Sequence, residues 1–192
     1  MKAFVKALTV LVAIAAIGGV VAFFLITSRG VSARSQPGWF ETTVARAMRS
    51  AAVPRGGKDR KNPLRFSDEV FASAKEHWAD HCASCHSNDG SGQTSIGLGL
   101  YPKAPDMRLP ATQSLSDGEL FYIIEHGVRF TGMPAWGTGD AAGEESSWQL
   151  VQFIRELPHL APDQRTRIEA LMPRSPDEIR QEILEQQFLN GQ

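Results

Sequence analysis

An uncharged run of 21 residues, Ala7 to Thr27, lies near the start of this 192-residue chain. As a helix, a run of this length extends roughly 30 Å, the thickness of the hydrocarbon core of a bilayer. Helices in the core of a soluble protein rarely carry so long a run that is apolar on all sides. The sequence therefore predicts a single transmembrane anchor over residues 1–30, with residues 7–27 inside the lipid bilayer.

A cleaved signal peptide is the alternative interpretation of this segment. Lys2 and Lys6 give a basic start, and residues 31–33, Val-Ser-Ala, resemble a cleavage site. The apolar part of a signal peptide is about 7–15 residues long, which is shorter than this run. Arg29 also stands between the run and the cleavage-like site, which favours an uncleaved anchor. The positive charges on the two sides are balanced, because Arg29 and Arg34 match the two lysines, so they do not determine the orientation.

Residues 31–66 are predicted to form a juxtamembrane helix and a linker. The helix covers Trp39 to Ala52, and its apolar face consists of Phe40, Val44, Met48 and Ala51. Near a membrane such a helix rests on the lipid headgroups, docks on a partner or caps the next domain. Residues 53–63 contain two glycines, two prolines and four basic residues, which is typical of a solvated tether.

The rest of the chain predicts helices and no strands, so the fold class is all-α. Ser67 is an N-cap, and its helix leads directly into the segment that contains the cysteines. After a glycine-rich loop from Asn88 to Leu100, a capping box at Ser116–Glu119 opens a second helix. A third helix covers about Glu144 to Leu157. Residues 159–192 add a C-terminal helical extension.

The chain has only two cysteines, and both lie in Cys82-Ala83-Ser84-Cys85-His86. Such a C-x-x-C pair is half of a zinc site, a redox-active disulfide or a haem attachment site. A structural zinc site needs four ligands, and no second C-x-x-C pair supplies the other two. A thioredoxin-like pair belongs beside a βαβ pattern, which is not found here. Because a histidine follows at once, we predict that Cys82 and Cys85 bind one haem c covalently and that His86 is an axial ligand of its iron.

Further stretches accompany this motif: Asn88-Asp89-Gly90-Ser91-Gly92, LSDGELFYIIEHGV, TGMPAW and a final aromatic-rich helix. With the helix that runs into CASCH, they make residues 67–158 similar to a class I monohaem cytochrome c domain. The resemblance is to the modules of membrane-anchored bacterial cytochromes and of the cytochrome subunits of C-family haem-copper oxidases. Those oxidase subunits usually carry two haem motifs, whereas this chain has one. The resemblance implies three main helices around one covalent haem.

The second axial ligand is predicted to be Met133, one of five methionines. It lies in Thr131-Gly132-Met133-Pro134, a loop in which the glycine permits close approach and the proline stiffens the strap. Class I cytochromes use methionine in this Gly-Met-Pro context, so the resemblance supports the assignment. The alternatives are that Met133 fills a gap in the core or that His126 is the ligand. Three methionines are excluded by their position in the chain: Met48, Met107 and Met172.

Other side chains are assigned around the predicted haem. The carbonyl of Pro102 or of Pro105 is expected to accept the Nδ1–H of His86, and the sequence leaves both open. Three side chains are expected to line the haem edge or propionates, namely Tyr101, Arg108 and Trp136, and core packing explains the two aromatic ones equally well. His77 and His81 are assigned to the helix that precedes the motif, without a ligand role.

An iron with His86 and Met133 as ligands has a raised reduction potential and no open position for a substrate. We therefore expect an electron-transfer protein rather than an enzyme, a membrane-anchored c-type cytochrome that passes single electrons between respiratory or dehydrogenase partners. One alternative is a permanently bound relay subunit of a larger membrane oxidoreductase complex. Another is a gas sensor or peroxidase-like haem protein with Met133 displaced. The net charge of −1 gives no bulk field that favours nucleic acid as a partner.

The resemblance also implies a location, because haem attachment of this type takes place outside the cytoplasm. The expected arrangement is a single-pass protein of the bacterial inner membrane. Its N-terminus lies in the cytoplasm and its haem domain in the periplasm.

Overall fold

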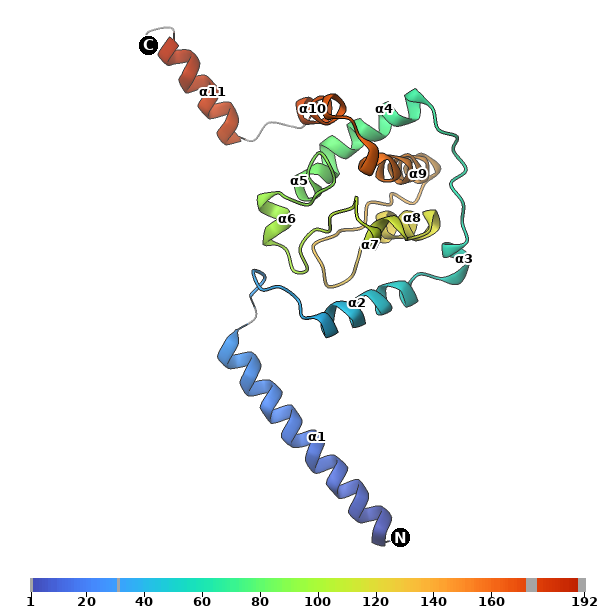
Figure 1. The fold of residues 1–192 in the computed structure, drawn as a ribbon, viewed down its shortest axis with the longest axis vertical. Helices are drawn as coiled ribbons and strands as arrows, with labels where there is room; N and C mark the ends of the chain where they lie inside the picture. The colour runs from blue at the N-terminus through green and yellow to red at the C-terminus, as the bar shows by residue number, and fades with distance from the viewer. Residues whose placement is uncertain (1, 31, 172–175, 190–192) are drawn as a thin grey trace. The chain divides into compact units, whose positions relative to one another are not determined.

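The computed structural model describes residues 2–30, 32–171 and 176–189, and within them every regular element is helical (Figure 1). The all-α fold class predicted from the sequence is therefore confirmed. The chain divides into two units, Met1–Ser35 and Gln36–Gln192. Met172, which was excluded as a ligand, lies outside the described residues.

The first unit contains the helix α1, Lys2–Arg29. Its segment Lys2–Ser28 is long and apolar enough to cross a membrane, and none of its residues is buried inside the protein. The hydroxyl of Thr9 donates to the Val5 carbonyl and that of Thr27 to the Phe23 carbonyl, both at 2.9 Å. These threonine hydroxyls therefore form their hydrogen bonds with the backbone of the same helix, as a lipid environment requires.

Three helical stretches form the centre of the second unit, and each begins where its sequence offers a cap. The helix α4, Asp68–His77, starts at Ser67, whose Oγ accepts from the Val70 amide at 3.2 Å. The helix α8, Asp117–His126, has both bonds of the capping box that the sequence predicts. The helix α9, Ala141–Glu156, starts three residues before the predicted Glu144, because Asp140 caps the Gly143 amide at 2.8 Å.

Beyond α4 the chain continues as one π-helical turn, η1, Trp78–Cys82, and then as α5, Ala83–His86. A 3₁₀ turn, η2, Leu157–His159, follows α9. The remaining helices are α2 Trp39–Ala52, α3 Arg55–Lys58, α6 Ser95–Gly99, α7 Pro110–Gln113, α10 Pro162–Leu171 and α11 Pro176–Leu189.

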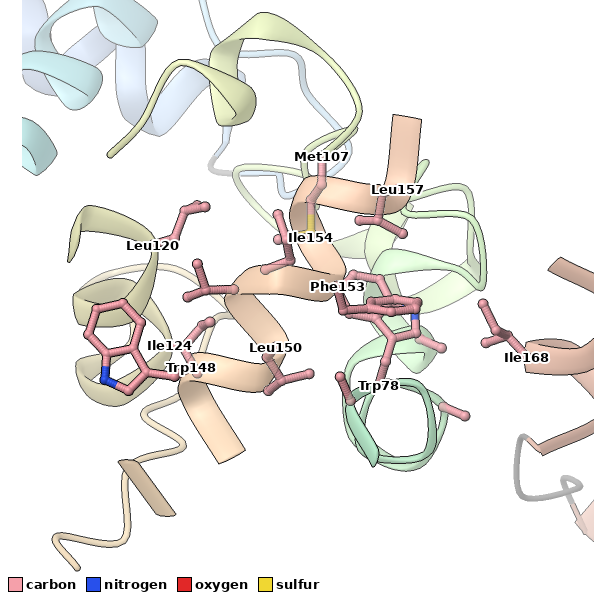
Figure 2. Close-up of a cluster of buried hydrophobic side chains, with 14 of the residues drawn as sticks. Trp78, Met107, Leu120, Ile124, Trp148, Leu150, Phe153, Ile154, Leu157 and Ile168 are labelled. Atoms are coloured by element: carbon pink, nitrogen blue, oxygen red, sulfur yellow. The ribbon is translucent and has the colours of Figure 1, made fainter. Parts of the chain in front are cut away.

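The core forms where α9 packs between α4 and α8 (Figure 1). Phe153 of α9 is completely buried and lies against Trp78, with ring centroids 5.2 Å apart. Towards α8, Trp148 stacks on Phe121 at 4.2 Å. Figure 2 shows Ile168 of α10 extending toward Trp78, and this isoleucine is also fully buried. Part of the C-terminal extension thus contributes to the core of the domain that precedes it.

The prediction of a solvated tether over residues 53–63 is wrong. The Lys58 carbonyl accepts a hydrogen bond from Ser116 at 2.7 Å, and the Asn62 amide donates to the Trp148 carbonyl at 2.8 Å. The guanidinium of Arg60 lies over the ring of Phe121, 4.3 Å from its centroid. The polar groups of this segment therefore bond to α8 and α9 and not only to water.

Replacement of Phe153 by alanine is expected to lower the free energy of unfolding of the holoprotein by about 3–5 kcal/mol, because it leaves a cavity beside Trp78. Phe130→Ala is the matched control, since Phe130 is 94% exposed, and we expect it to change stability by less than about 0.5 kcal/mol. Denaturant unfolding of both variants measures the difference. Equal stabilities would show that Phe153 does not anchor the core.

Candidate haem site

The turns η1 and α5 carry the C-x-x-C-H motif at the end of α4. Cys82 and Cys85 are free thiols with partly buried side chains, and His86 is only 8% exposed. Immediately after it, Ser87 adopts φ 66° and ψ 161°, a backbone conformation that costs energy for any residue except glycine. The indole of Trp78 donates to the Ser87 carbonyl at 3.1 Å. The buried core thus holds the strained turn that ends the motif.

The state of the thiols argues against a thioredoxin-like pair. Burial, together with the neighbouring Cys85, raises the pKa of the Cys82 thiol to about 12. A thiol with such a pKa stays protonated and is a poor nucleophile, whereas redox-active cysteines have lowered pKa values.

A zinc site is not supported either. His77 and His81 have the spacing H-x-x-x-H, and their rings meet edge to face at 5.0 Å. However, the part of the chain that the structure describes contains no cluster of three His, Cys, Asp or Glu side chains able to hold a metal ion. The ring of His81 packs instead against Trp136, with ring centroids 5.2 Å apart. Trp136 lies in the same loop as Met133.

The imidazole of His86 is poised as a neutral ligand. Burial lowers the pKa of His86, and the Pro105 carbonyl acts weakly in the opposite direction. The Nδ1 atom is buried and has no hydrogen bond of normal geometry, so Pro105 lies near it without completing the bond. Between the two prolines that the sequence left open, the structure favours Pro105. A neutral imidazole is the form that coordinates a metal.

The loop after the motif folds back onto it. The amide of Gly92 donates to the His86 carbonyl at 2.8 Å, and the hydroxyl of Thr94 donates to the Cys85 carbonyl at 3.2 Å. A Cβ atom on Gly97 would collide with that same Cys85 carbonyl, so glycine permits α6 to pack closely on α5. The segment that the sequence predicts as a loop thus contains a short helix, α6. Its side chains Ile96 and Leu98 are exposed.

An ion network closes this loop and was not predicted from the sequence. The guanidinium of Arg108 donates to Asp89 at 2.7 Å and to both oxygens of Asp106 at 2.8 and 2.9 Å. Hydrogen bonds from Arg108 lower the pKa of Asp106. Burial alone would raise the pKa of Asp89, but hydrogen bonds from Ser91 and the charge of Arg108 outweigh it and lower that pKa. Arg108, one of the side chains predicted to line the haem edge or propionates, is thus bound to two carboxylates.

Replacement of Arg108 by glutamine is expected to lower the free energy of unfolding at neutral pH by about 1 kcal/mol, since the network is partly exposed and solvent screens it. Because the pKa of Asp106 is lowered in the folded protein, its ionised carboxylate stabilises the fold fully above the ordinary pKa of 3.8. This stabilisation is lost as the pH falls through the lowered pKa. The difference between wild type and variant should therefore shrink below about pH 4. Arg167→Gln, at an exposed pair, is the control and should cost less than about 0.5 kcal/mol.

The loop that carries Met133 is a strap between α8 and α9. The Met133 carbonyl accepts from the Val128 amide and its amide donates to the Thr131 hydroxyl, both at 3.1 Å. The Trp136 amide donates to the Ile124 carbonyl at 3.0 Å, which ties the end of the strap to α8. The Met133 side chain is partly buried. A Cβ on Gly132 would meet the end of the Leu100 side chain, so glycine lets these loops approach closely without displacing that leucine.

The residues present fit a covalently bound haem. They include two adjacent thiols, a buried imidazole with an unbonded Nδ1, and exposed apolar side chains on the helix packed against the motif. An all-helical domain that presents C-x-x-C-H in this way has the features of a cytochrome c domain. Residues 69–154 match the family model described as cytochrome C oxidase, cbb3-type, subunit III. No curated protein matches the chain.

The matched residues cover the predicted haem site. It includes all four residues proposed to bind haem, which are Cys82, Cys85, His86 and Met133. Their individual roles, including ligation by Met133, remain predictions. The helices α1, α2, α3, α10 and α11 fall outside the match. Sequence reasoning missed the contribution of Trp78 to the turn after His86, although its place on the apolar face of the preceding helix was a usable signal.

Proposed function

We propose that this chain is a membrane-anchored c-type cytochrome that transfers single electrons through one haem. Cys82 and Cys85 form the two thioethers, and His86 and Met133 are the axial ligands. The observation that carries the proposal is the buried imidazole of His86, whose pKa is lowered by burial, directly after two adjacent thiols. When bound, the haem supplies a one-electron couple whose potential is raised by a methionine ligand.

The residues of the chain would serve this transfer by holding both ligands still. The turn at Ser87, fixed by Trp78, positions His86, and the hydrogen bonds of the strap position Met133. Two fixed ligands leave no open position on iron, so the protein acts as a carrier and not as a catalyst. Because neither ligand has to move, oxidation and reduction require little rearrangement.

The helix α1 is proposed to anchor the protein in the bacterial inner membrane, with the N-terminus in the cytoplasm and the haem domain in the periplasm. Its length and apolar composition support a single span. Tethering confines the haem near its redox partners and raises their effective concentration.

The optical spectrum of the reduced holoprotein, with and without carbon monoxide, tests this function. An unchanged spectrum is the expected result, because His86 and Met133 leave no site for the gas. A rapid spectral shift would contradict the closed site and would favour the gas sensor or peroxidase-like alternative, with Met133 displaced.

A second candidate is a permanently bound relay subunit of a larger membrane oxidoreductase complex. The matched family is named for an oxidase subunit. In addition, α11 exposes large apolar side chains, namely Ile183, Leu184, Phe188 and Leu189. Such a surface suits burial against another chain. Isolation in mild detergent separates the two candidates, since a free carrier appears as a species of 21.0 kDa plus haem and detergent, whereas a subunit appears with its partners.

A further inference from the structure

The helix α2 is amphipathic, and its hydrogen bonds to the rest of its unit are made by polar side chains. Glu41 accepts a hydrogen bond from the Tyr101 hydroxyl, and Ser50 accepts one from Lys58 at 3.0 Å. Arg49 is partly buried, which lowers its pKa, and the nearby carboxylate of Glu119 partly offsets this effect. The contacts of α2 with the domain are therefore made by polar and charged groups.

The apolar side of α2 is exposed. Phe40, Val44 and Met48 repeat every four residues and so lie on one face, with exposed fractions of 67%, 39% and 67%. No residue of the helix is buried. An amphipathic helix on a soluble domain normally buries its apolar face, and here that face points away from the domain. This result excludes packing of the apolar face on the haem domain, one of the roles that the sequence left open.

Chain connectivity and composition identify what covers this face. Only residues 30–38 separate α2 from α1, and nine residues reach at most about 30 Å, so an inserted α1 keeps the start of α2 near the bilayer surface. Trp39 and Phe40 begin the helix with their rings in edge-to-face contact at 5.9 Å. Such aromatic residues favour the interface between lipid and water.

The basic residues within α2 and close to it in the sequence fit the surface of a bilayer that contains anionic lipids. Arg46 lies on the polar side of α2 with Thr43 and Ser50, and it is exposed. Arg34 before the helix and Arg55 after it are exposed as well. By contrast, α11 also exposes apolar side chains, but its sequence carries four acidic residues and one arginine, which anionic headgroups would repel.

We propose that α2 lies in the interface of the lipid bilayer, with Phe40, Val44 and Met48 inserted among the lipids and the flanking Arg34 and Arg55 near the headgroups. This proposal rests on the proposed anchoring by α1 and adds a second membrane contact. The polar contacts of α2, made by Glu41, Arg49 and Ser50, then hold the haem domain at the membrane surface, so the domain is restrained in orientation and not only in distance.

Spin labels on the full-length holoprotein test the proposal. With Cys82 and Cys85 bonded to haem, a cysteine at Met48 is the only thiol that can be labelled. The M48C protein is reconstituted in vesicles of phosphatidylcholine and phosphatidylglycerol, with most vesicles holding a single copy. The nitroxide is then exposed to oxygen, which enters lipid, and to a nickel complex, which stays in water. We expect collisions with the nickel complex to be severalfold fewer than for the control label at T43C, on the polar side of the same helix.

The controls separate the possible failures. A label at L184C, on the exposed apolar face of α11, should remain as accessible to the nickel complex as the T43C label. Equal access of nickel to the Met48 and Thr43 labels would overturn the proposal. So would protection of Met48 in native membranes but not in pure lipid vesicles, because a partner protein would then cover α2. Failure of the protein to float with vesicles would instead contradict anchoring by α1, and labelling at more than one thiol would contradict covalent haem attachment.

Discussion

Replacing both Cys82 and Cys85 by serine is expected to abolish covalent retention of haem. The two thiols are the only groups of the chain able to form thioethers with the haem vinyl groups. Acidified organic solvent should extract all haem from this double variant and none from the wild type. Each single variant should retain haem through its remaining thioether, with an altered absorption band of the reduced pyridine complex.

Ser84→Ala is the matched control for this experiment. Ser84 lies between the two cysteines, is exposed, and donates only to the His81 carbonyl at 3.1 Å. It should therefore retain covalent haem at the level of the wild type. Covalent haem in the double serine variant would show that attachment uses other chemistry, and the proposed site would be wrong.

Replacing Met133 by alanine is expected to lower the reduction potential by on the order of 0.1 V, a fraction of the range of about 0.8 V that axial ligands control. Loss of the sulfur should also open the iron, so that carbon monoxide binds the reduced protein quickly. A redox titration and the carbon monoxide spectrum measure the two effects independently.

Met107→Leu is the control for a general effect of losing a methionine. Met107 is buried in the core at 9% exposure, and leucine conserves its volume, so the change should cost less than about 1.5 kcal/mol of stability. Its potential and its lack of reaction with carbon monoxide should match the wild type. If Met133→Ala behaves like this control, another group is the sixth ligand, and His126 is then the first candidate.

The helices with strong local signals could be predicted from the sequence. The N-cap at Ser67 and the capping box at Ser116 mark true helix starts, because these signals act within one turn and depend little on the rest of the fold. The uncharged run near the start corresponds to the helix α1 for the same reason. The start of α9 was missed by three residues because Asp140, the actual cap, follows a run of loop residues.

Features that depend on contacts between distant residues could not be predicted in this way. The segment 53–63 has the composition of a tether, yet its backbone and side chains bond to groups far along the chain, such as Ser116 and Trp148. The role of Arg108 depends likewise on the approach of Asp89. Hydrogen-bond partners of this kind are invisible to residue composition.

The amino-acid sequence by itself determined the helical class, the candidate membrane span and the C-x-x-C-H site, because periodicity, length and residue spacing are local properties of the chain. Only the tertiary structure decided that Pro105 is the carbonyl near His86, that Ile168 belongs to the core, and that the apolar side of α2 faces outward. An amphipathic pattern indicates that a helix has one apolar face and one polar face. Which face meets the domain depends on the charged and polar partners that folding brings beside it.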